Sequence, residues 1–476
     1  MSSNLTRAAV VSLFLLQVGG GCEGHGTDDT GAVLAVTLRA SENDSGQEGN
    51  AKSGVESARP FTDQTEFTRQ AVSADGRKVA FTSDASNLVA GDTNSVPDVF
   101  VRDTLTGTTT RASLDPAGSQ FPAASGMAAV SADGRYVAFE NGLGAARQIY
   151  RRNLETGVTE LVTEAVSGGP AGNACYHPSL SADGRFVAYY SNAFDVRPPG
   201  ELGNFAWDVL VRDMTVAPSA GGHRLASCDS MGGELGGGSW NPSISADGRW
   251  VAFQTIVGLA AGDMNGGAPL PHPLDVYVRD MQDTVTFAMT WISSSPAGLN
   301  VTRQPGFFYT AVEHPFISPD GNFVAFQTLA DDVVSGDTNG VIDVFVRART
   351  GGPTERVSVN AGGVEARTPA QTASDGSFRP SLSSDGRFVA FHSNAFNLVT
   401  GDFNQARDVF VKDRATGGVV RVSVRTFGEE TLSGQGSSFG SISAEGRFVA
   451  FTSGSPNLAE NDINGVDDVF LRGPLR

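Results

Sequence analysis

One short pattern recurs seven times along the chain. In its commonest form it reads Ser-Ala-Asp-Gly-Arg, then a variable residue, then Val-Ala-Phe. Its acidic residues are Asp75, Asp133, Asp183, Asp247, Asp320, Asp385 and Glu445. Neighbouring copies are separated by between 50 residues (183 − 133) and 73 residues (320 − 247). Self-similarity at a period of tens of residues predicts a fold assembled from equivalent units.

Each copy predicts the same set of strands. The Asp-Gly pair predicts a tight hairpin turn, because glycine adopts a positive φ without a Cβ clash. The strand that follows, for example 388–391, is apolar on both faces, as expected for a strand buried between two sheets. A polar loop leads to a third strand, such as 408–411, and a Thr-Gly turn precedes a fourth, such as 421–424.

Seven units of four antiparallel strands predict an all-β protein, a seven-bladed β-propeller. A solenoid is the alternative arrangement of such repeats. The last copy ends after its third strand at 468–472, whereas a segment at 34–41, before the first copy, has the pattern of a fourth strand. We therefore expect this N-terminal strand to complete the last blade and close the ring, which removes open sheet edges. A solenoid would have no use for such complementary ends.

The repeated Ser-Pro/Ala-Asp-Gly-Arg-x-Val-Ala-Phe pattern resembles the TolB-type, WD-repeat-like propeller repeat. The resemblance covers roughly residues 33–476, and it implies the fold. It implies no particular function, since one propeller scaffold hosts many unrelated roles. The chain differs from TolB because no separate α/β domain is recognisable before the propeller. A role in that translocation system is therefore not implied.

The N-terminus has the features of an export signal. Arg7 is followed by an apolar run at 8–18, which is too short to span a bilayer but suits the core of a signal peptide. Three glycines before Cys22 resemble a bacterial lipoprotein cleavage site, which would leave the Cys22 thiol for lipidation. Plain secretion is the alternative. We therefore divide the chain into a lipoprotein-like signal peptide (1–21), a linker (22–32) and the propeller (33–476).

Charge limits the partners. The chain has 52 acidic and 34 basic residues, a formal net charge of −18. Such a surface repels phosphate backbones, so nucleic acid is a poor partner. We expect a monomer in the bacterial cell envelope or outside the cell, with an envelope protein, a peptide or a glycan as partner. Contact with the membrane is expected only through the lipid.

Two cysteines remain after Cys22, and an exported pair invites a disulfide. Cys175 precedes an inner strand, and Cys228 ends the outer strand of the same blade in this interpretation. Three strand spacings separate them by about 14 Å, whereas a disulfide needs Cα atoms within about 7 Å. Only a loop that folds back over the blade could join them.

The loop between the second and third strands repeats a set of oxygen-bearing side chains. It reads Gly-Asp-x-Asn in most copies, and an aspartate begins the strand that follows. Such oxygens suit calcium, and the alternative is an Asx turn that satisfies N–H groups of the loop. The residues are Asp92, Asn94, Asp98, Asp337, Asn339, Asp343, Asp402, Asn404, Asp408, Asp462, Asn464 and Asp468.

A second set of positions lies six and seven residues before each acidic turn residue. We expect these residues to begin the innermost strands and to surround one mouth of the central channel. Cationic and polar groups beside aromatic rings suit a small anionic or polar ligand, and packing between blades is the alternative. The candidate ligand residues are Arg69, Tyr176, His177, Trp240, Asn241, Glu313, His314 and Arg379. The histidines would add positive charge below about pH 6.5.

We therefore predict an exported, lipid-anchored propeller that acts as a non-enzymatic binding module or scaffold. Two alternatives stay open: a propeller enzyme, either a lyase or a glycan hydrolase, with its site at the channel mouth, and a calcium-stabilised structural protein of the envelope. No catalytic residue is predicted. A Gly-x-Ser-x-Gly match around Ser438 lacks the helix that a nucleophile elbow requires.

Overall fold

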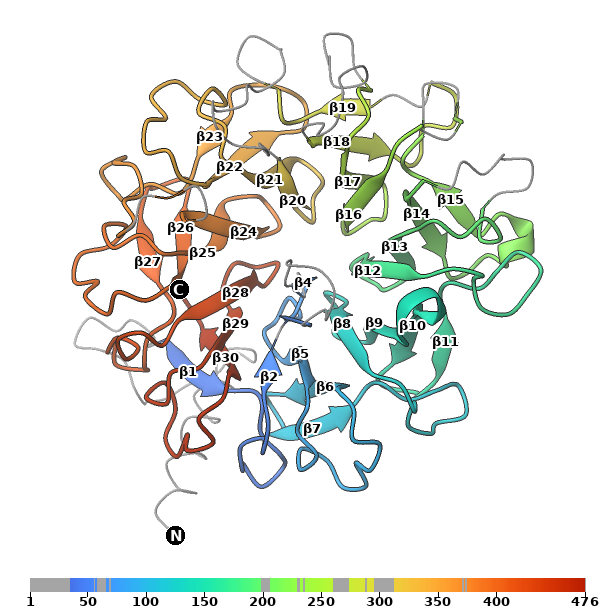
Figure 1. Cartoon of the computed structure of the whole chain (residues 1–476), viewed down its shortest axis with the longest axis horizontal. Helices are drawn as coiled ribbons and strands as arrows, with labels where there is room; N and C mark the ends of the chain where they lie inside the picture. The colour runs from blue at the N-terminus through green and yellow to red at the C-terminus, as the bar shows by residue number, and fades with distance from the viewer. Residues whose placement is uncertain are drawn as a thin grey trace, which may run out of the picture.

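The chain forms seven four-stranded antiparallel sheets arranged in a ring around a central axis (Figure 1). The fold prediction is therefore confirmed. The structure is a computed structural model that describes residues 35–54, 56–57, 66–67, 70–197, 206–228, 232–233, 236–259, 274–286, 289–294, 312–369, 372 and 375–475. The predicted signal peptide, Cys22 and Arg69 lie outside these residues.

Within each blade the four strands lie side by side, and the first one named is the nearest to the ring axis. Blades one to three contain β2 (Ser53–Gly54), β5 (Lys78–Ser83), β6 (Asp98–Asp103), β7 (Thr108–Arg111); β8 (Ser125–Val130), β9 (Tyr136–Asn141), β10 (Gln148–Asn153), β11 (Thr159–Leu161); and β12 (Cys175–Leu180), β13 (Phe186–Ser191), β14 (Asp208–Asp213), β15 (His223–Leu225). Blades four and five contain β16 (Ser239–Ile244), β17 (Trp250–Thr255), β18 (Asp275–Asp280), β19 (Met289–Trp291); and β20 (Glu313–Ile317), β21 (Phe323–Thr328), β22 (Asp343–Ala348), β23 (Glu355–Arg356). Blades six and seven contain β24 (Ser377–Leu382), β25 (Phe388–Ser393), β26 (Asp408–Asp413), β27 (Val419–Arg421); and β28 (Ser437–Ile442), β29 (Val449–Ser453), β30 (Asp468–Gly473), β1 (Val36–Arg39).

The N-terminal strand closes the ring, as the sequence predicts. β1 pairs antiparallel with β30, from Val36 opposite Gly473 to Arg39 opposite Phe470. The contact continues past the strand, because the Ser41 hydroxyl donates to Asp468 over 2.5 Å. The strand is shorter than the expected segment 34–41. Its place as the outer strand of blade seven is the predicted one.

The innermost strand of blade one differs from the prediction. Counting back from Asp75 assigns Thr68 to its start, opposite Thr82. In the structure Gly54 of β2 pairs with Thr82, and Ser53 pairs with Ser83. The chain rejoins the blade at the bridge between Val72 and Val79. The intervening segment contains the short pair β3 (Glu56–Ser57) and β4 (Glu66–Phe67), which lies towards the ring axis (Figure 1). A fixed count from the turn cannot detect such an insertion.

The second strand of every blade is buried between its neighbours. In β21, Val324, Ala325 and Phe326 have no exposed surface. Val324 and Phe326 belong to an apolar cluster shared with blade four, whereas Ala325 belongs to one shared with blade six. Alternate residues of a strand point to opposite faces, so both faces need apolar side chains. This explains why the repeat reads Val-Ala-Phe rather than as an apolar–polar alternation.

The glycine of each Asp-Gly turn also serves the contact between blades. Gly386 has a φ of +66°, and a Cβ added there would lie 2.4 Å from the Phe323 ring of the preceding blade. The residue two positions after the turn glycine of each repeat packs in this way on the next glycine around the ring. The pairs are Lys78 with Gly134, Tyr136 with Gly184, Phe186 with Gly248, Trp250 with Gly321, Phe323 with Gly386, Phe388 with Gly446 and Phe448 with Gly76.

Cys175 and Cys228 are both buried and are not joined in a disulfide. Cys228 lies three residues beyond the end of β15, and both side chains belong to the same apolar cluster. The expectation that blade geometry keeps them apart agrees with this arrangement.

None of the helices among the described residues is long and apolar enough to cross a membrane.

Deleting residues 1–41 tests the closure of the ring. The deletion removes β1 and exposes the edge of β30, so we expect a lower melting temperature, less cooperative unfolding and aggregation. The matched control is deletion of residues 1–32, which leaves β1 in place and should melt like the longer chain in differential scanning calorimetry. Equal melting of the two truncations would show that β1 does not hold the ring closed.

Gly386→Ala tests the contact between blades. The variant combines an alanine at positive φ with a clash against Phe323, so we expect a loss of about 2–4 kcal/mol in the free energy of unfolding. Gly428→Ala is the control, because Gly428 also has a positive φ (+88°) but has open space around its Cα. It should lose only about 1 kcal/mol. Equal losses in urea denaturation would contradict a role for the aromatic contact.

Candidate functional site

The positions singled out at the channel mouth lie at a bulge in the innermost strands of blades two to seven. Between Tyr176 and Ser179 the register with β13 shifts, and His177 at this bulge has a φ of +54°. The corresponding residues of the other blades have φ values of 52–60°, and they are Met127, Asn241, His314, Arg379 and Phe439. A left-handed conformation costs a residue other than glycine about 1–2 kcal/mol. The surroundings must therefore hold these residues in place.

Most of these bulges are held by a hydrogen bond that the bulge N–H donates to a side chain of the preceding blade. The His177 N–H donates to Glu140 Oε1 over 2.7 Å, and the Arg379 N–H donates to Gln327 Oε1 over 2.7 Å. In the four bonds of this kind the acceptor is the residue after Val-Ala-Phe in the preceding repeat, namely Glu140, Gln254, Gln327 or His392. In blade seven the acceptor is His392 Nδ1, 3.1 Å from the Phe439 nitrogen. Complete burial lowers the pKa of His392 well below its ordinary value, which keeps the ring neutral and able to accept.

Most bulge side chains lie inside the wall of the channel. His177, Asn241 and His314 are only 9%, 7% and 7% exposed, whereas Arg379 is half-buried. The bulge thus turns these side chains between the inner strands, where they pack between blades rather than face the mouth. The half-buried residues just before the bulges, such as Tyr176 and Trp240, are the more accessible members of the candidate set.

Blades three and four form an aromatic sector of the mouth. Tyr176 stacks on Tyr190 with ring centres 5.2 Å apart, and it contacts Trp207 at 5.5 Å. Trp240 packs against the same apolar cluster. The Arg147 guanidinium, paired with Glu140 at 2.8 Å, lies over the Tyr176 ring at 5.2 Å. We name Tyr176, Trp207 and Trp240 the aromatic sector.

Blades five to seven form a charged sector. His314 Nε2 lies 3.8 Å from Glu313 Oε2, and Arg379 lies over the Phe439 ring at 5.2 Å. Burial raises the pKa of Glu313, and the nearby positive charge of Arg379 opposes this shift. The structure therefore brings Glu313, His314 and Arg379 together. Tyr176 and Trp240 pack against one apolar cluster, and His177 contacts Tyr190 of that cluster with ring centres 5.3 Å apart. Sequence reasoning missed Trp207, although it stands just before a strand-initial aspartate, Asp208.

The candidate calcium loops are built around arginine side chains. In blade five the Arg356 guanidinium lies 2.8 Å from Asp337, 3.3 Å from Asp343 and 2.9 Å from Glu365. Asn339 donates its amide to Asp343 over 2.8 Å, and its carbonyl accepts the Val341 N–H over 3.2 Å. The second of these contacts is the Asx turn considered as the alternative to calcium.

The other loops repeat this arrangement. Arg421 pairs with Asp402, Asp408 and Glu430, Arg111 pairs with Asp92 and Asp98, and Arg39 pairs with Glu48 and Asp468. The amides of Asn94, Asn404 and Asn464 donate to Asp98, Asp408 and Asp468. The arginines were missed, although each stands two residues before a serine that donates to the strand-initial aspartate.

Each loop cluster holds more carboxyl groups than arginines, and the pKa values of several of these carboxyl groups are raised. Burial raises the pKa of Asp337 to about 7, and the neighbouring Asp343 carboxylate adds to the shift. Burial likewise raises the pKa of Asp402 and of Asp468 to about 6. Oxygens of Glu48, Asp462 and Asp468 lie close enough together to bind a cation. The guanidinium supplies positive charge beside these oxygens, and calcium binding stays a prediction.

No family model matches the chain, and no curated protein is similar to it. Solved structures that resemble it include an oligogalacturonate lyase in complex with manganese, at 13% identity and a TM-score of 0.49 over 92% of this chain and 93% of that one. A putative TolB from Agrobacterium tumefaciens is similar at 18% identity and a TM-score of 0.38, over 77% of this chain and 94% of that one. TolB from Acinetobacter baumannii is similar at 14% identity and a TM-score of 0.36, over 85% and 82%. These identities are below 25% and the TM-scores are below 0.5, so the propeller fold rests on the strand pairing of this chain itself.

Asp337→Asn tests the buried carboxyl groups of the loops. Between its ordinary pKa of 3.8 and about 7, folded Asp337 keeps a proton that the unfolded chain has released, so stability falls as pH rises through this window. We expect a shallower fall of the melting temperature between pH 4 and pH 7 in the variant, measured against the exposed control Glu155→Gln. An unchanged pH profile would contradict a raised pKa at Asp337.

The same proteins test calcium binding. A ligand that binds only the folded state raises the melting temperature, so calcium binding requires a difference between millimolar calcium and chelator. Asp337→Asn combined with Asp402→Asn should reduce that difference if these two loops bind the ion, and any remaining response is then assigned to the cluster of Glu48, Asp462 and Asp468. Equal melting of the unaltered protein under both conditions would leave the arginine–carboxylate clusters as the sole role of these loops.

Proposed function

We propose that this chain is an exported propeller, anchored by a lipid on Cys22, that acts as a non-enzymatic binding module. It binds the C-terminal end of an envelope polypeptide at the channel mouth. The observation that carries the proposal is the aromatic sector beside the charged sector on one rim. A peptide end offers both an apolar side chain and a carboxylate, and so can use both sectors.

The aromatic sector supports the binding of an apolar side chain. Tyr176, Trp207 and Trp240 are each half-buried, so their outer surfaces are available while neighbouring rings hold them in place. Aromatic rings contribute large contact areas and lose little conformational freedom on binding. The stacking of Tyr176 on Tyr190 and the position of Arg147 over it fix this ring before any ligand arrives.

The charged sector supports recognition of the carboxylate. Arg379 is half-buried at its bulge, and the hydrogen bond from its N–H to Gln327 fixes its backbone. A guanidinium binds a carboxylate through paired hydrogen bonds. The net charge of −18 opposes long-range attraction of an anion, so recognition depends on local contacts at Arg379.

The export part of the proposal depends on the sequence. The apolar run at 8–18 and the glycines before Cys22 support a signal peptide and lipid attachment. Growth with radiolabelled palmitate should label the unaltered chain, and Cys22→Ala should abolish the labelling. Labelling that persists in the variant would refute the anchor.

Arg379→Ala and Trp240→Phe test the binding site. We expect both variants to weaken binding of peptides with a free C-terminal carboxylate, followed by tryptophan fluorescence, because each removes one proposed contact. Arg379→Ala should cost no more than about 1 kcal/mol of stability, because the side chain is only half-buried. Trp291→Phe is the control, because Trp291 lies on the outer strand β19 and stacks on Tyr277.

Peptides with an amidated C-terminus separate the two contacts. The unaltered protein should bind amidated peptides more weakly than free ones. Arg379→Ala should bind both kinds with the same affinity, because the contact between the carboxylate and the guanidinium is already lost in this variant. A loss of several kcal/mol of stability in Arg379→Ala would identify Arg379 as a packing residue. That result, or equal binding of free and amidated peptides, would refute the proposed site.

A further inference from the structure

A pocket of about 410 Å³ lies between blades six and seven. Its polar side chains come from several loops: Asp375 precedes β24, Asn394 follows β25, and Gln405 and Arg407 precede β26. Ser438 of β28 adds a hydroxyl group from blade seven. The volume is within the range of small-molecule sites, which is about 300–1,000 Å³. None of the peptide contacts proposed above uses these residues.

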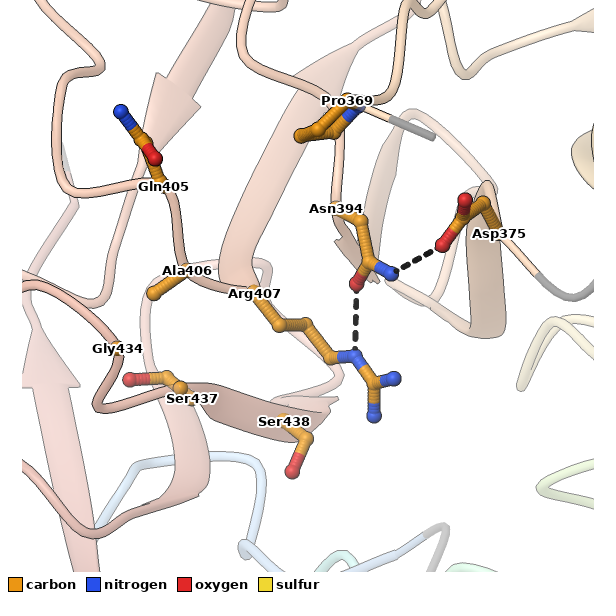
Figure 2. Close-up of a pocket in the computed structure, with 10 residues that line it drawn as sticks. Pro369, Asp375, Asn394, Gln405, Ala406, Arg407, Gly434, Ser437 and Ser438 are labelled. Atoms are coloured by element: carbon orange, nitrogen blue, oxygen red, sulfur yellow. Dashed lines mark hydrogen bonds between the residues drawn. The ribbon is translucent and has the colours of Figure 1, made fainter. Parts of the chain in front are cut away.

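A hydrogen-bonded chain of three side chains borders the pocket. Arg407 Nε donates to Asn394 Oδ1 over 2.9 Å, and Asn394 Nδ2 donates to Asp375 Oδ1 over 3.1 Å (Figure 2). The second oxygen of Asp375 accepts from the N–H and the hydroxyl of Thr372 at 3.3 and 3.0 Å. These contacts fix the Asn394 amide, with its oxygen towards the guanidinium and its nitrogen towards the carboxylate.

Arg407 is fixed by further contacts with both blades. Its guanidinium lies over the Phe378 ring of blade six at 5.8 Å, and its backbone carbonyl accepts the N–H of Ser437 in blade seven over 2.6 Å. Figure 2 shows the side chain running between Asn394 and Ser438. The residue is nevertheless exposed, so solvent reaches it. The polar groups of the pocket are therefore preorganised, which lowers the entropic cost of binding.

From these contacts we infer that the pocket binds a neutral, hydroxyl-rich ligand, namely a mono- or disaccharide unit of a glycan. One guanidinium and one carboxylate leave the lining without net charge, and each already binds a neighbouring side chain. Carboxamide and hydroxyl groups both donate and accept hydrogen bonds, as sugar hydroxyls do. The net charge of −18 disfavours an anionic ligand. This site goes beyond the proposed peptide site and does not depend on it.

Titration of the mature chain with neutral disaccharides tests the inference. The probes are cellobiose, maltose, lactose and N,N′-diacetylchitobiose, followed by isothermal titration calorimetry. We expect at least one to bind, and both Arg407→Ala and Asn394→Ala to weaken it about tenfold, as for the loss of one or two hydrogen bonds. Arg135→Ala is the charge-matched control, because Arg135 pairs with Glu155 at the turn end of blade two, and it should bind like the unaltered chain.

Two further measurements separate this pocket from the peptide site and a sugar from a charged ligand. Trp240→Phe should leave sugar binding unchanged, which separates this site from the proposed peptide site. Glycylglycine and galacturonic acid test a zwitterionic and an anionic ligand in the same pocket. Tighter binding of either of these, no binding of any disaccharide, or sugar binding that survives both pocket variants would overturn the inference. Melting curves of the variants check that the blades remain folded.

Discussion

The architecture depends on backbone hydrogen bonds between neighbouring blades. At the mouth, the residue before each third strand accepts an N–H from the start of the next inner strand, over 2.6–3.1 Å. This contact occurs seven times, including the one from Ser53 to Asp467 between blades one and seven. At the other end of the channel the turns are linked similarly, for example Ala182 N–H to the Ala246 carbonyl at 2.9 Å. Each blade thus satisfies polar groups of the next, and a single blade would leave them unpaired.

Closure of the ring follows from the same constraint. The first and last strands that the structure describes, β1 and β30, belong to one blade, so the last inter-blade contacts join residues more than 400 positions apart, such as Ser53 and Asp467. β1 pairs with β30 and so covers the outer edge that β30 would otherwise expose. Arg39 of β1 forms an ion pair with Asp468 in the loop cluster of that blade. The buried loop clusters belong to this scheme, because four arginines of fourth strands secure the loops that lead into the third strands of their blades: Arg39, Arg111, Arg356 and Arg421.

The repeat predicts the fold almost completely, whereas the site is predictable only in part. Asp-Gly turns, Val-Ala-Phe strands and the displaced outer strand each have one physical interpretation, so the blades and their closure could be derived. The excursion before Ala71 could not, since it keeps no fixed spacing from Asp75. The left-handed bulges were also missed, because residues as different as His177 and Arg379 occupy them and no glycine marks the conformation.

That variety has a physical origin in the bulge itself. Its backbone is held by the N–H bond to the preceding blade, as between Arg379 and Gln327, and this bond uses no atom of the bulge side chain. The ring therefore constrains the conformation of these positions but not their chemistry. Differences between blades can accumulate there at little cost to stability. Together with the residues just before the bulges, such as Tyr176 and Trp240, they divide a symmetric mouth into aromatic and charged sectors. A ligand that contacts both sectors can bind in only one orientation, which a uniform ring of seven equal side chains could not impose.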